Sequence, residues 1–413
     1  MTPYEAERPL GALKSLRQRN RNQVVALLRE SGTLHRAELA RRAGLSRSTV
    51  TTIVSALIAE GVVTEALPGE PTGPGADVPR AGSRGRVGEL LRLASTTGAA
   101  LGIDYSQDVV RAVLCDAAHN VLAEEVEQLP ETSEWPFRLE AGLAAADQVF
   151  QRVGGVPDRF LGVGLGMPDP IDLVTGRVTR ARSGPLWPGA RAADEFAARL
   201  GVPVAVDNTS HLAALAEMTW GGGTGVRHAA YLKMSYGIGA GLFLDGRLYR
   251  GAVGAAGEIG HTSVDDDGPA CHCGSRGCLE LYVGTPAIVA AMRPRLGASV
   301  TIADVIAGAR EGDRACLRVL EDAGARTGRA MANLCNLLNL ERIVVGGDLA
   351  AAGDALLEPM RRAIERFALG VASANARVVP AKLGQRAGAL GGVALVLREV
   401  DRNGASYRAE PSG

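Results

Sequence analysis

The chain has 413 residues, equal numbers of basic and acidic side chains (45 of each) and 46% hydrophobic residues. This length exceeds one ordinary domain and predicts about two or three, in a protein of globular composition. It contains no run of about 20 apolar residues and no apolar N-terminal segment, so we expect no membrane span, no signal peptide and a cytoplasmic location.

The first 64 residues carry an excess of positive charge. They contain ten Lys or Arg residues and five acidic residues, a difference of +5, so the rest of the chain is net acidic. A small basic region on an acidic body is typical of a segment that meets a polyanion such as DNA. Charge alone leaves open the alternative of a solvated basic surface.

Three helical patterns follow one another in this basic region. Residues 22–32 and 35–45 show helical apolar spacing with a glycine near the end, and a third helix is expected from Ser46, a good N-cap, to Gly61. The apolar stripe of the third helix leaves a hydroxyl-rich edge outside it. This pattern predicts a helix-turn-helix that contacts DNA through four residues of that edge: Arg47, Ser48, Thr51 and Thr52.

Two further segments predict a wing. Residues 62–67 and 87–95 read as strands, and residues 66–86 between them are so rich in Pro and Gly that we expect a long mobile tip. Arg84 and Arg86 near this tip are expected to reach a minor groove. A three-helix head with a purely structural role is the alternative.

The remaining chain reads as two similar α/β lobes. Three strands are expected between residues 99 and 129, followed by a helix and a strand, and a related order recurs after residue 228. Two such lobes enclose a site for a small ligand. We expect a winged helix-turn-helix domain, a first lobe, and a second lobe whose C-terminal helix packs back on the first, over residues 1–95, 96–205 and 206–413 respectively.

The segment from residue 258 to 280 carries the most specific local signal. His261 and three Cys lie within 18 residues, and one His with three Cys in a reducing compartment favours a closed tetrahedral zinc site over a disulfide. We expect one structural zinc ion per chain, with His272 pointing away from it. The expected ligands are His261, Cys271, Cys273 and Cys278. Three unrelated buried cysteines are the alternative.

These residues carry a resemblance to a known family. The chain resembles the ROK family (repressor, open reading frame, kinase), in particular its repressor branch, because "LGVGLGMPDPID", "YGIGAGLFLDGRLYRG", "GEIGH", "CHCGSRGCLE" and "IVVGGDL" occur in family order. The resemblance spans nearly the whole chain. It implies an α/β fold with an actin-like, sugar-kinase-like body, a zinc site beside a sugar pocket, and homodimers or homotetramers.

The resemblance also implies which side chains hold a sugar. The matching residues are Asn208, Glu258, His261 and Glu280, with Thr209 beside them at the family's catalytic Asp position. Carboxylates and an amide provide paired acceptors and donors for vicinal hydroxyl groups. Read from the residues alone, the two glutamates are equally well explained as partners in loop salt bridges.

Several kinase features are missing. A Thr hydroxyl cannot act as the general base for a sugar hydroxyl at neutral pH, and His211 replaces the family's second Asn. A one-residue slip would put Asp207 in the role of base. The phosphate-binding Gly turn is replaced by residues 105–108, and Tyr236 and Asp169 occupy positions that the family usually fills with small residues.

The sequence therefore predicts a DNA-binding transcriptional regulator, expected to be a repressor, that senses a sugar or sugar derivative without phosphorylating it. A sugar kinase with residual activity is one alternative. A regulator that is controlled by a protein partner and retains only a relic of the pocket is the other.

Overall fold

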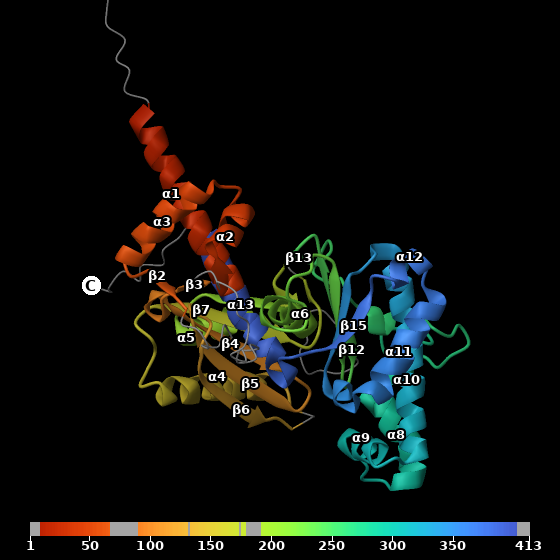
Figure 1. Ribbon diagram of the computed structural model, residues 1–413. Coiled ribbons are helices and arrows are strands. Elements are labelled where there is room, and N and C mark those ends of the chain that lie inside the picture. The colour runs from red at the N-terminus through yellow and green to blue at the C-terminus, as the bar shows by residue number, and fades with distance from the viewer. Residues whose placement is uncertain (1–8, 67–89, 131–132, 173–174, 179–190, 403–413) are drawn as a thin grey trace, which may run out of the picture.

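The computed structural model describes residues 9–66, 90–130, 133–172, 175–178 and 191–402 (Figure 1). These residues form a small N-terminal head and a larger body of two lobes, each built around a five-stranded sheet. The expected two-lobe α/β body with an N-terminal helix-turn-helix is confirmed. In this described part, no helix is long and apolar enough to cross a membrane.

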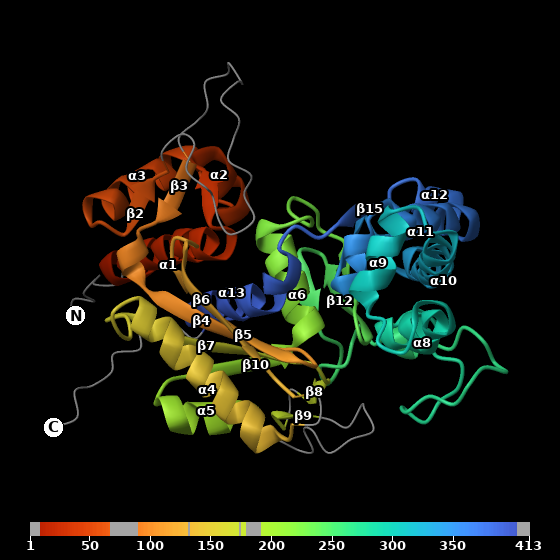
Figure 2. The same cartoon turned by 90° about the horizontal axis from the view of Figure 1, so that it is seen from below.

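The head combines helices with a small antiparallel sheet (Figure 2). Its elements are α1 (Pro9–Ser31), β1 (Thr33–His35), α2 (Arg36–Ala43), α3 (Arg47–Ala59), β2 (Val63–Glu65) and β3 (Leu90–Leu93), and the strand order is β1-β3-β2. Apolar side chains from all three helices and from β3 meet in one core. Fully buried members include Val24, Leu28, Leu39, Val54, Leu57 and Leu91.

The turn between α2 and α3 follows the sequence signals. Gly44 adopts a left-handed conformation (φ 64°), and its N–H donates a hydrogen bond back to the last turn of α2. The left-handed conformation favours glycine at this position. Ser46 then caps α3, its Oγ accepting a hydrogen bond from the Thr49 N–H over 3.1 Å. This short turn sets the third helix at an angle to the second, as in a helix-turn-helix.

The head also differs from expectation. α1 begins at Pro9 instead of residue 22, because residues 11–21 lack apolar periodicity but are mostly helix-favouring Ala, Leu, Lys, Arg and Gln. Strand β1 was not expected, since its three residues carry too little pattern; it pairs with β3. The expected wing tip, with Arg84 and Arg86, lies outside the described residues.

The first lobe is a mixed sheet with helices on both faces. Its strands are β4 (Ala99–Tyr105), β5 (Val109–Asp116), β6 (Val121–Gln128), β7 (Phe160–Met167) and β10 (Val204–Asn208), in the order β10-β7-β4-β5-β6. Helices α4 (Trp135–Arg152) and α5 (Ala192–Leu200) cover one face, and a two-stranded ribbon of β8 (Ile171–Asp172) and β9 (Arg177–Val178) extends from β7.

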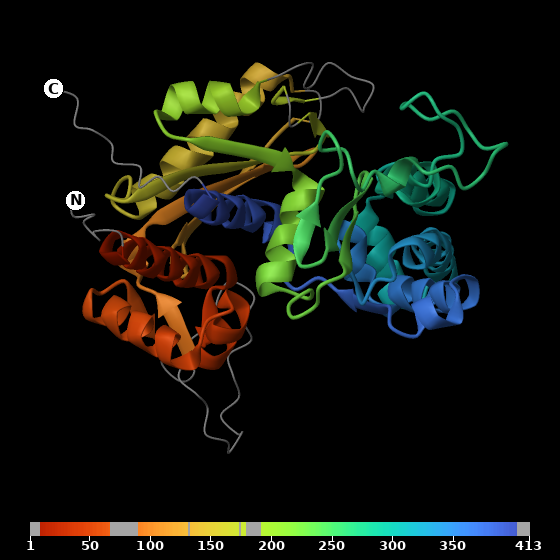
Figure 3. The same ribbon diagram turned by 90° about the horizontal axis from the view of Figure 1, so that it is seen from above.

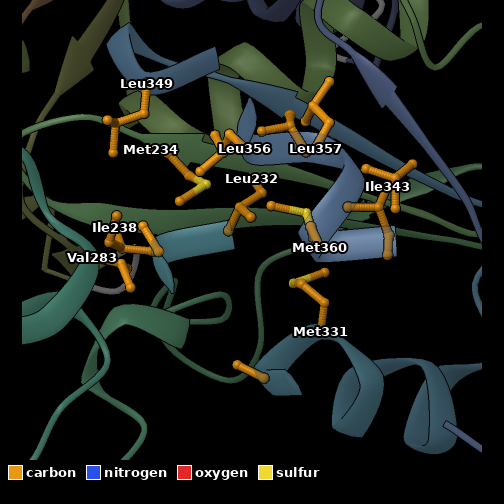
Figure 4. Packing of buried hydrophobic residues seen from close by; sticks show 14 of the residues in the cluster. Leu232, Met234, Ile238, Val283, Met331, Ile343, Leu349, Leu356, Leu357 and Met360 are labelled. Atoms are coloured by element: carbon orange, nitrogen blue, oxygen red, sulfur yellow. The ribbon is translucent and has the colours of Figure 1, made fainter. Parts of the chain in front are cut away.

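The second lobe repeats this plan. Its strands are β11 (Ala229–Met234), β12 (Ile238–Leu244), β13 (Arg247–Tyr249), β14 (Arg342–Gly346) and β15 (Arg377–Pro380), in the order β13-β12-β11-β14-β15. Helices α7 (Glu280–Val283), α8 (Thr285–Leu296), α9 (Ile302–Arg310), α10 (Arg314–Leu338), α11 (Asp354–Phe367) and α12 (Gly370–Ser373) form its outer layer. Figure 4 shows Leu232 and Ile343 of the sheet meeting Met331 of α10 and Met360 of α11.

Two helices fill the space between the sheets. α6 (Thr209–Trp220) packs on β11 and β12, and α13 (Ala387–Arg402) packs on β4, β7 and α6. Figure 3 shows α13, in dark blue, lying along the strands of the first lobe beside the head. The approach is close enough that a Cβ atom at Gly102 would overlap the Ala389 carbonyl, and one at Gly164 would overlap Gly392.

Candidate functional site

A cavity of about 350 Å³ lies between the two lobes. The first lobe contributes the ends of β4 and β7, α6 contributes its first turn, and the second lobe contributes the β11–β12 turn and the segment around Glu258. All five residues expected to contact a ligand line this cavity: Asn208, Thr209, Glu258, His261 and Glu280. The fold therefore brings together side chains that lie up to 72 positions apart in the sequence.

At the start of α6, the hydroxyl group of Thr209 is hydrogen-bonded to the carboxyl group of Asp104. Thr209 itself carries no carboxyl group at the family's catalytic position. Its Oγ1 donates to Asp104 Oδ1 over 2.8 Å, and both residues are buried. Burial raises the pKa of Asp104 to about 6, although nearby Lys233 acts against the shift. Beside Thr209, the N-cap residue Asn208 accepts a hydrogen bond from the Ser210 N–H over 2.8 Å.

Asp207, the alternative base, is already paired. Its carboxylate accepts hydrogen bonds from His211 Nδ1 over 2.9 Å and from Arg250 Nε over 2.7 Å. Burial favours the neutral acid, but these partners hold the pKa of Asp207 below its ordinary value. A carboxylate with two cationic partners is poorly placed to take a proton from a ligand.

His211 links the Asp207 carboxylate to the segment that carries Glu258. Its Nε2 donates to the Ala256 carbonyl over 2.7 Å while Nδ1 donates to Asp207. Because both partners accept, the imidazole is doubly protonated. Burial lowers the pKa of His211, but the hydrogen bond to Asp207, the charge of Asp207 and the hydrogen bond to Ala256 together outweigh burial and raise the pKa. The sequence marked His211 as a departure from the family pattern and gave no sign of this bridging role.

The two glutamates of the cavity have different surroundings. Glu280 Oε2 accepts a hydrogen bond from the Ile238 N–H over 2.9 Å, at the start of β12. Glu258 Oε2 lies 4.0 Å from His261 Nε2, and burial raises the pKa of Glu258 to about 7. Both face the cavity, so each keeps polar surface for a ligand.

Behind the cavity, one histidine and three cysteines converge. The ligand atoms of His261, Cys271, Cys273 and Cys278 all lie within 4.8 Å of one another. His261 Nδ1 is 3.7 Å from Cys271 Sγ, and Cys273 Sγ is 3.7 Å from Cys278 Sγ. Such separations match the edges of a tetrahedron around a metal held by sulfur at ~2.3 Å and nitrogen at ~2.0 Å. The group can hold a metal ion.

His272 is not placed as expected. Its Nδ1 lies 3.8 Å from Cys271 Sγ, and its ring meets that of His261 edge-on at 5.3 Å. Its Nε2 is 4.0 Å from Glu280 Oε1. The side chain therefore lies beside Cys271, His261 and Glu280 instead of pointing away from the Cys/His group, because the tight loop brings residues 261, 271 and 280 close to residue 272.

Residues 105–108, which replace a glycine turn, are held by hydrogen bonds from a buried arginine. Arg138 of α4 is fully buried and donates to the carbonyl groups of Ser106 and Gln107 over 3.2 and 2.9 Å. Tyr105 donates to the Arg138 carbonyl over 2.7 Å. The loop carbonyls thus point at a guanidinium inside the lobe. A lone Arg within a helical pattern gave no signal of this role.

In the head, the expected DNA-facing residues share an exposed surface at the start of α3. Arg47, Ser48, Thr51 and Thr52 are all exposed. The threonine hydroxyls bond back to the helix, Thr51 to the Arg47 carbonyl over 2.9 Å and Thr52 to the Ser48 carbonyl over 3.1 Å. Their methyl groups and the Arg47 side chain are therefore presented outward, which suits contact with groove edges.

Comparison with known proteins gives two family matches. Residues 100–399 match the model of the ROK family, and residues 17–64 match that of winged helix-turn-helix DNA-binding domains. The first match covers nearly all of both lobes, and the second runs from within α1 into β2.

Individual relatives agree with these matches. The chain is 28% identical to the xylose repressor of Caldicellulosiruptor bescii, over 93% of this chain and 97% of the relative. It is similar to the crystal structure of a ROK family transcriptional regulator described as a homolog of the Escherichia coli Mlc protein (TM-score 0.73, 26% identity, 94% of this chain and 97% of the other). A ROK glucokinase from Streptomyces griseus with glucose and AMPPNP matches over 72% of this chain and 99% of its own (TM-score 0.63, 26% identity).

Proposed function

The chain belongs to the ROK family, and we propose that it is a DNA-binding transcriptional repressor whose interlobe pocket senses a sugar or sugar derivative without phosphorylating it. One observation carries the proposal. A DNA-binding head is joined to a kinase-like body in which Thr209, at the catalytic position, is bonded to Asp104. The relatives that match nearly the whole chain are named as repressors.

The head supports binding to operator DNA. The first turn of α3 exposes Arg47 and Ser48, and Thr51 and Thr52 follow on the same edge. A helix of this kind enters a major groove and reads base edges with such side chains. Because one recognition helix reads one half-site, we propose that a homodimer or homotetramer binds the operator, in the cytoplasm where the DNA lies.

Loss of catalysis is supported by three features of the pocket. Thr209 carries no ionisable base, and Asp207 is occupied by His211 and Arg250. The loop of residues 105–108 has no glycine for close backbone approach to a phosphate, and Asp108, which lines the cavity, would repel one. Among the described residues, six carboxyl groups and two Lys or Arg side chains line the cavity, and this excess of acid would repel a triphosphate: Asp104, Asp108, Asp169, Glu258, Glu280 and Asp348 against Arg111 and Lys233.

The same carboxyl groups suit a neutral polyol. Glu258, Glu280 and Asn208 provide acceptors and donors from both lobes, so that one ligand can contact both. The matched full-length relative is named for xylose, and we propose D-xylose as the first sugar to test.

The metal group fits structural zinc, and we propose one ion held by His261, Cys271, Cys273 and Cys278. Bound zinc fixes the conformation of its loop. In this chain the loop leads directly to Glu280 at the start of α7, and His261 Nε2 faces Glu258. The ligand set would therefore orient the polar wall of the pocket.

The test combines three measurements on the full chain. Titration calorimetry with D-xylose and D-glucose should show binding of at least one sugar, and a coupled assay with ATP should show no sugar-dependent ADP release. Duplex DNA enriched by the protein from a random pool should share one sequence motif. Sugar-dependent ADP release that Glu258→Ala abolishes would establish a working kinase and refute the proposal.

A further inference from the structure

Helix α6 joins the pocket to the head. Its first turn carries Asn208, Thr209 and Ser210, which line the cavity, and its last residue is Trp220. The helix has 12 residues, all buried except Thr219, which is partly exposed. It is thus about 18 Å long at ~1.5 Å per residue. In Figure 2, one end of α6 lies beside the head and the other lies near the end of β10.

His119 connects the end of α6 to the head. It lies in the turn between β5 and β6, with a left-handed backbone (φ 69°), and is 1% exposed. The Trp220 indole N–H donates to His119 Nδ1 over 2.7 Å, and His119 Nε2 lies 2.7 Å from the Arg29 carbonyl. An indole N–H only donates and a carbonyl only accepts, so the two partners fix one neutral tautomer of the imidazole.

The carbonyl that His119 reaches belongs to the last turn of α1. Helix carbonyl groups there have no partner within the helix, so His119 caps α1 from the body. Packing at this point is tight: a Cβ atom added to Gly32, which follows α1, would lie 2.7 Å from His119 Nδ1. Ala117 of the same turn belongs to the hydrophobic core of the head.

A second connection runs parallel to the first. Arg398 of α13 donates to Thr219 Oγ1 over 3.2 Å and pairs with Glu30 of α1 at 3.3 Å. The last two residues of α6 therefore both connect to the last turn of α1, one through His119 and the other through Arg398.

We propose that α6 couples the pocket to the head through the hydrogen bonds Trp220–His119–Arg29. A ligand that changes the position of the first turn of α6 would move the buried helix as a unit and shift Trp220 against His119. The end of α1, and with it the head, would then change its position on the body. This inference rests on the proposed function, because it names the route by which the sugar pocket would regulate DNA binding.

The coupling can be tested without sugar or DNA, so its failure is distinct from failure of the proposed function. Hydrogen exchange by mass spectrometry would follow the amide groups of residues 28–34 in the full chain. Trp220→Phe keeps a ring but removes the indole donor, and should speed exchange there by about two- to tenfold, as expected for one hydrogen bond. Trp135→Phe is the matched control, because it removes an indole bond to Glu195 far from the head.

The decisive experiment changes the first turn of α6, which lines the pocket. Thr209→Val removes the bond to Asp104 and should also speed exchange in residues 28–34. In the Trp220→Phe background it should add nothing, because the connection is already broken. If Thr209→Val does not fold, Asn208→Ala, which removes the N-cap of α6, takes its place.

Either of two results would overturn the proposal. One is unchanged exchange in residues 28–34 of Trp220→Phe. The other is that Thr209→Val speeds exchange in residues 28–34 by the same factor in the wild-type and the Trp220→Phe background. Such additive behaviour is expected if the two residues stabilise the fold independently.

Discussion

At the residue scale, our proposal of a pocket without catalysis rests most directly on the pair of Thr209 and Asp104. A carboxyl group is present, but it lies on β4, is buried and accepts a hydrogen bond from the Thr209 hydroxyl. Its environment favours the protonated acid, since burial raises the pKa of Asp104 to about 6. The pair thus acts as a hydrogen-bonded anchor for the start of α6.

The raised pKa of Asp104 makes a prediction about stability and pH. The folded chain binds this proton more tightly than the unfolded chain, so the stabilisation is complete below pH ~3.8 and is lost as pH rises through about 6. Asp104→Asn, whose amide oxygen still accepts from Thr209, should therefore raise the free energy of unfolding at pH 8 by about 1–3 kcal/mol relative to pH 4. Urea unfolding of both proteins at the two pH values measures this. An equal effect at both values would contradict the assignment.

Restoring the missing acid should not restore a kinase. Thr209→Asp would place a second carboxyl group against Asp104, where the two cannot easily ionise together. The loop of residues 105–108 would still lack the glycines of a phosphate-binding turn and would still carry Asp108. We expect no ADP release with D-xylose or D-glucose, and a melting temperature lower at pH 8 than at pH 5. Turnover by this variant would show that the pocket had lost only its base.

At the element scale, capping and loop chemistry were predictable while buried polar partners were not. Gly44 and Ser46 predict the adjacent helix ends from local sequence, and the Cys/His spacing predicts the cluster of possible metal ligands. Arg138 and His119 acquire their roles only when distant backbone carbonyls arrive beside them, so no local pattern marks them. The predicted orientation of the His272 side chain was wrong for the same reason, since that orientation depends on how the loop folds.

Helix α3 carries the prediction for DNA. Arg47→Ala should weaken binding to an enriched DNA site by about 1–3 kcal/mol, the value of one good base contact. Arg318→Ala, which removes an exposed arginine of α10, is the charge-matched control and should leave binding unchanged. A gel shift at fixed salt compares the two. Equal affinities for the variants would remove Arg47 from the contact surface.

The Cys/His loop carries the prediction for metal. Cys273→Ala should lower zinc content from one ion per chain to nearly none and weaken sugar binding through Glu280, while Cys335→Ala, in α10, should retain the metal. Elemental analysis of protein purified without chelators gives the count. Absence of zinc from the wild-type protein would contradict the site.

At the scale of the whole molecule, the head and the pocket are separate sites of one chain, and any coupling between DNA binding and sugar binding must be reciprocal. A sugar that changes the affinity for DNA by some factor is itself bound more tightly or weakly by the same factor when DNA is present. Glu258→Ala should abolish both effects together while the protein still binds DNA. Calorimetry with and without DNA tests this. A DNA response to sugar that survives Glu258→Ala would place the sensor elsewhere.

The position of α13 has a consequence for biosynthesis. This helix is the last of the described elements, yet it covers the sheet of the first lobe so closely that Gly102 and Gly164 admit no side chain. Domains fold from the N-terminus as the ribosome proceeds. The head can therefore form early, whereas the first lobe keeps an apolar face uncovered until α13 emerges. A nascent chain would hold a complete DNA-binding unit before its regulatory body can close, and would need protection from aggregation during that interval.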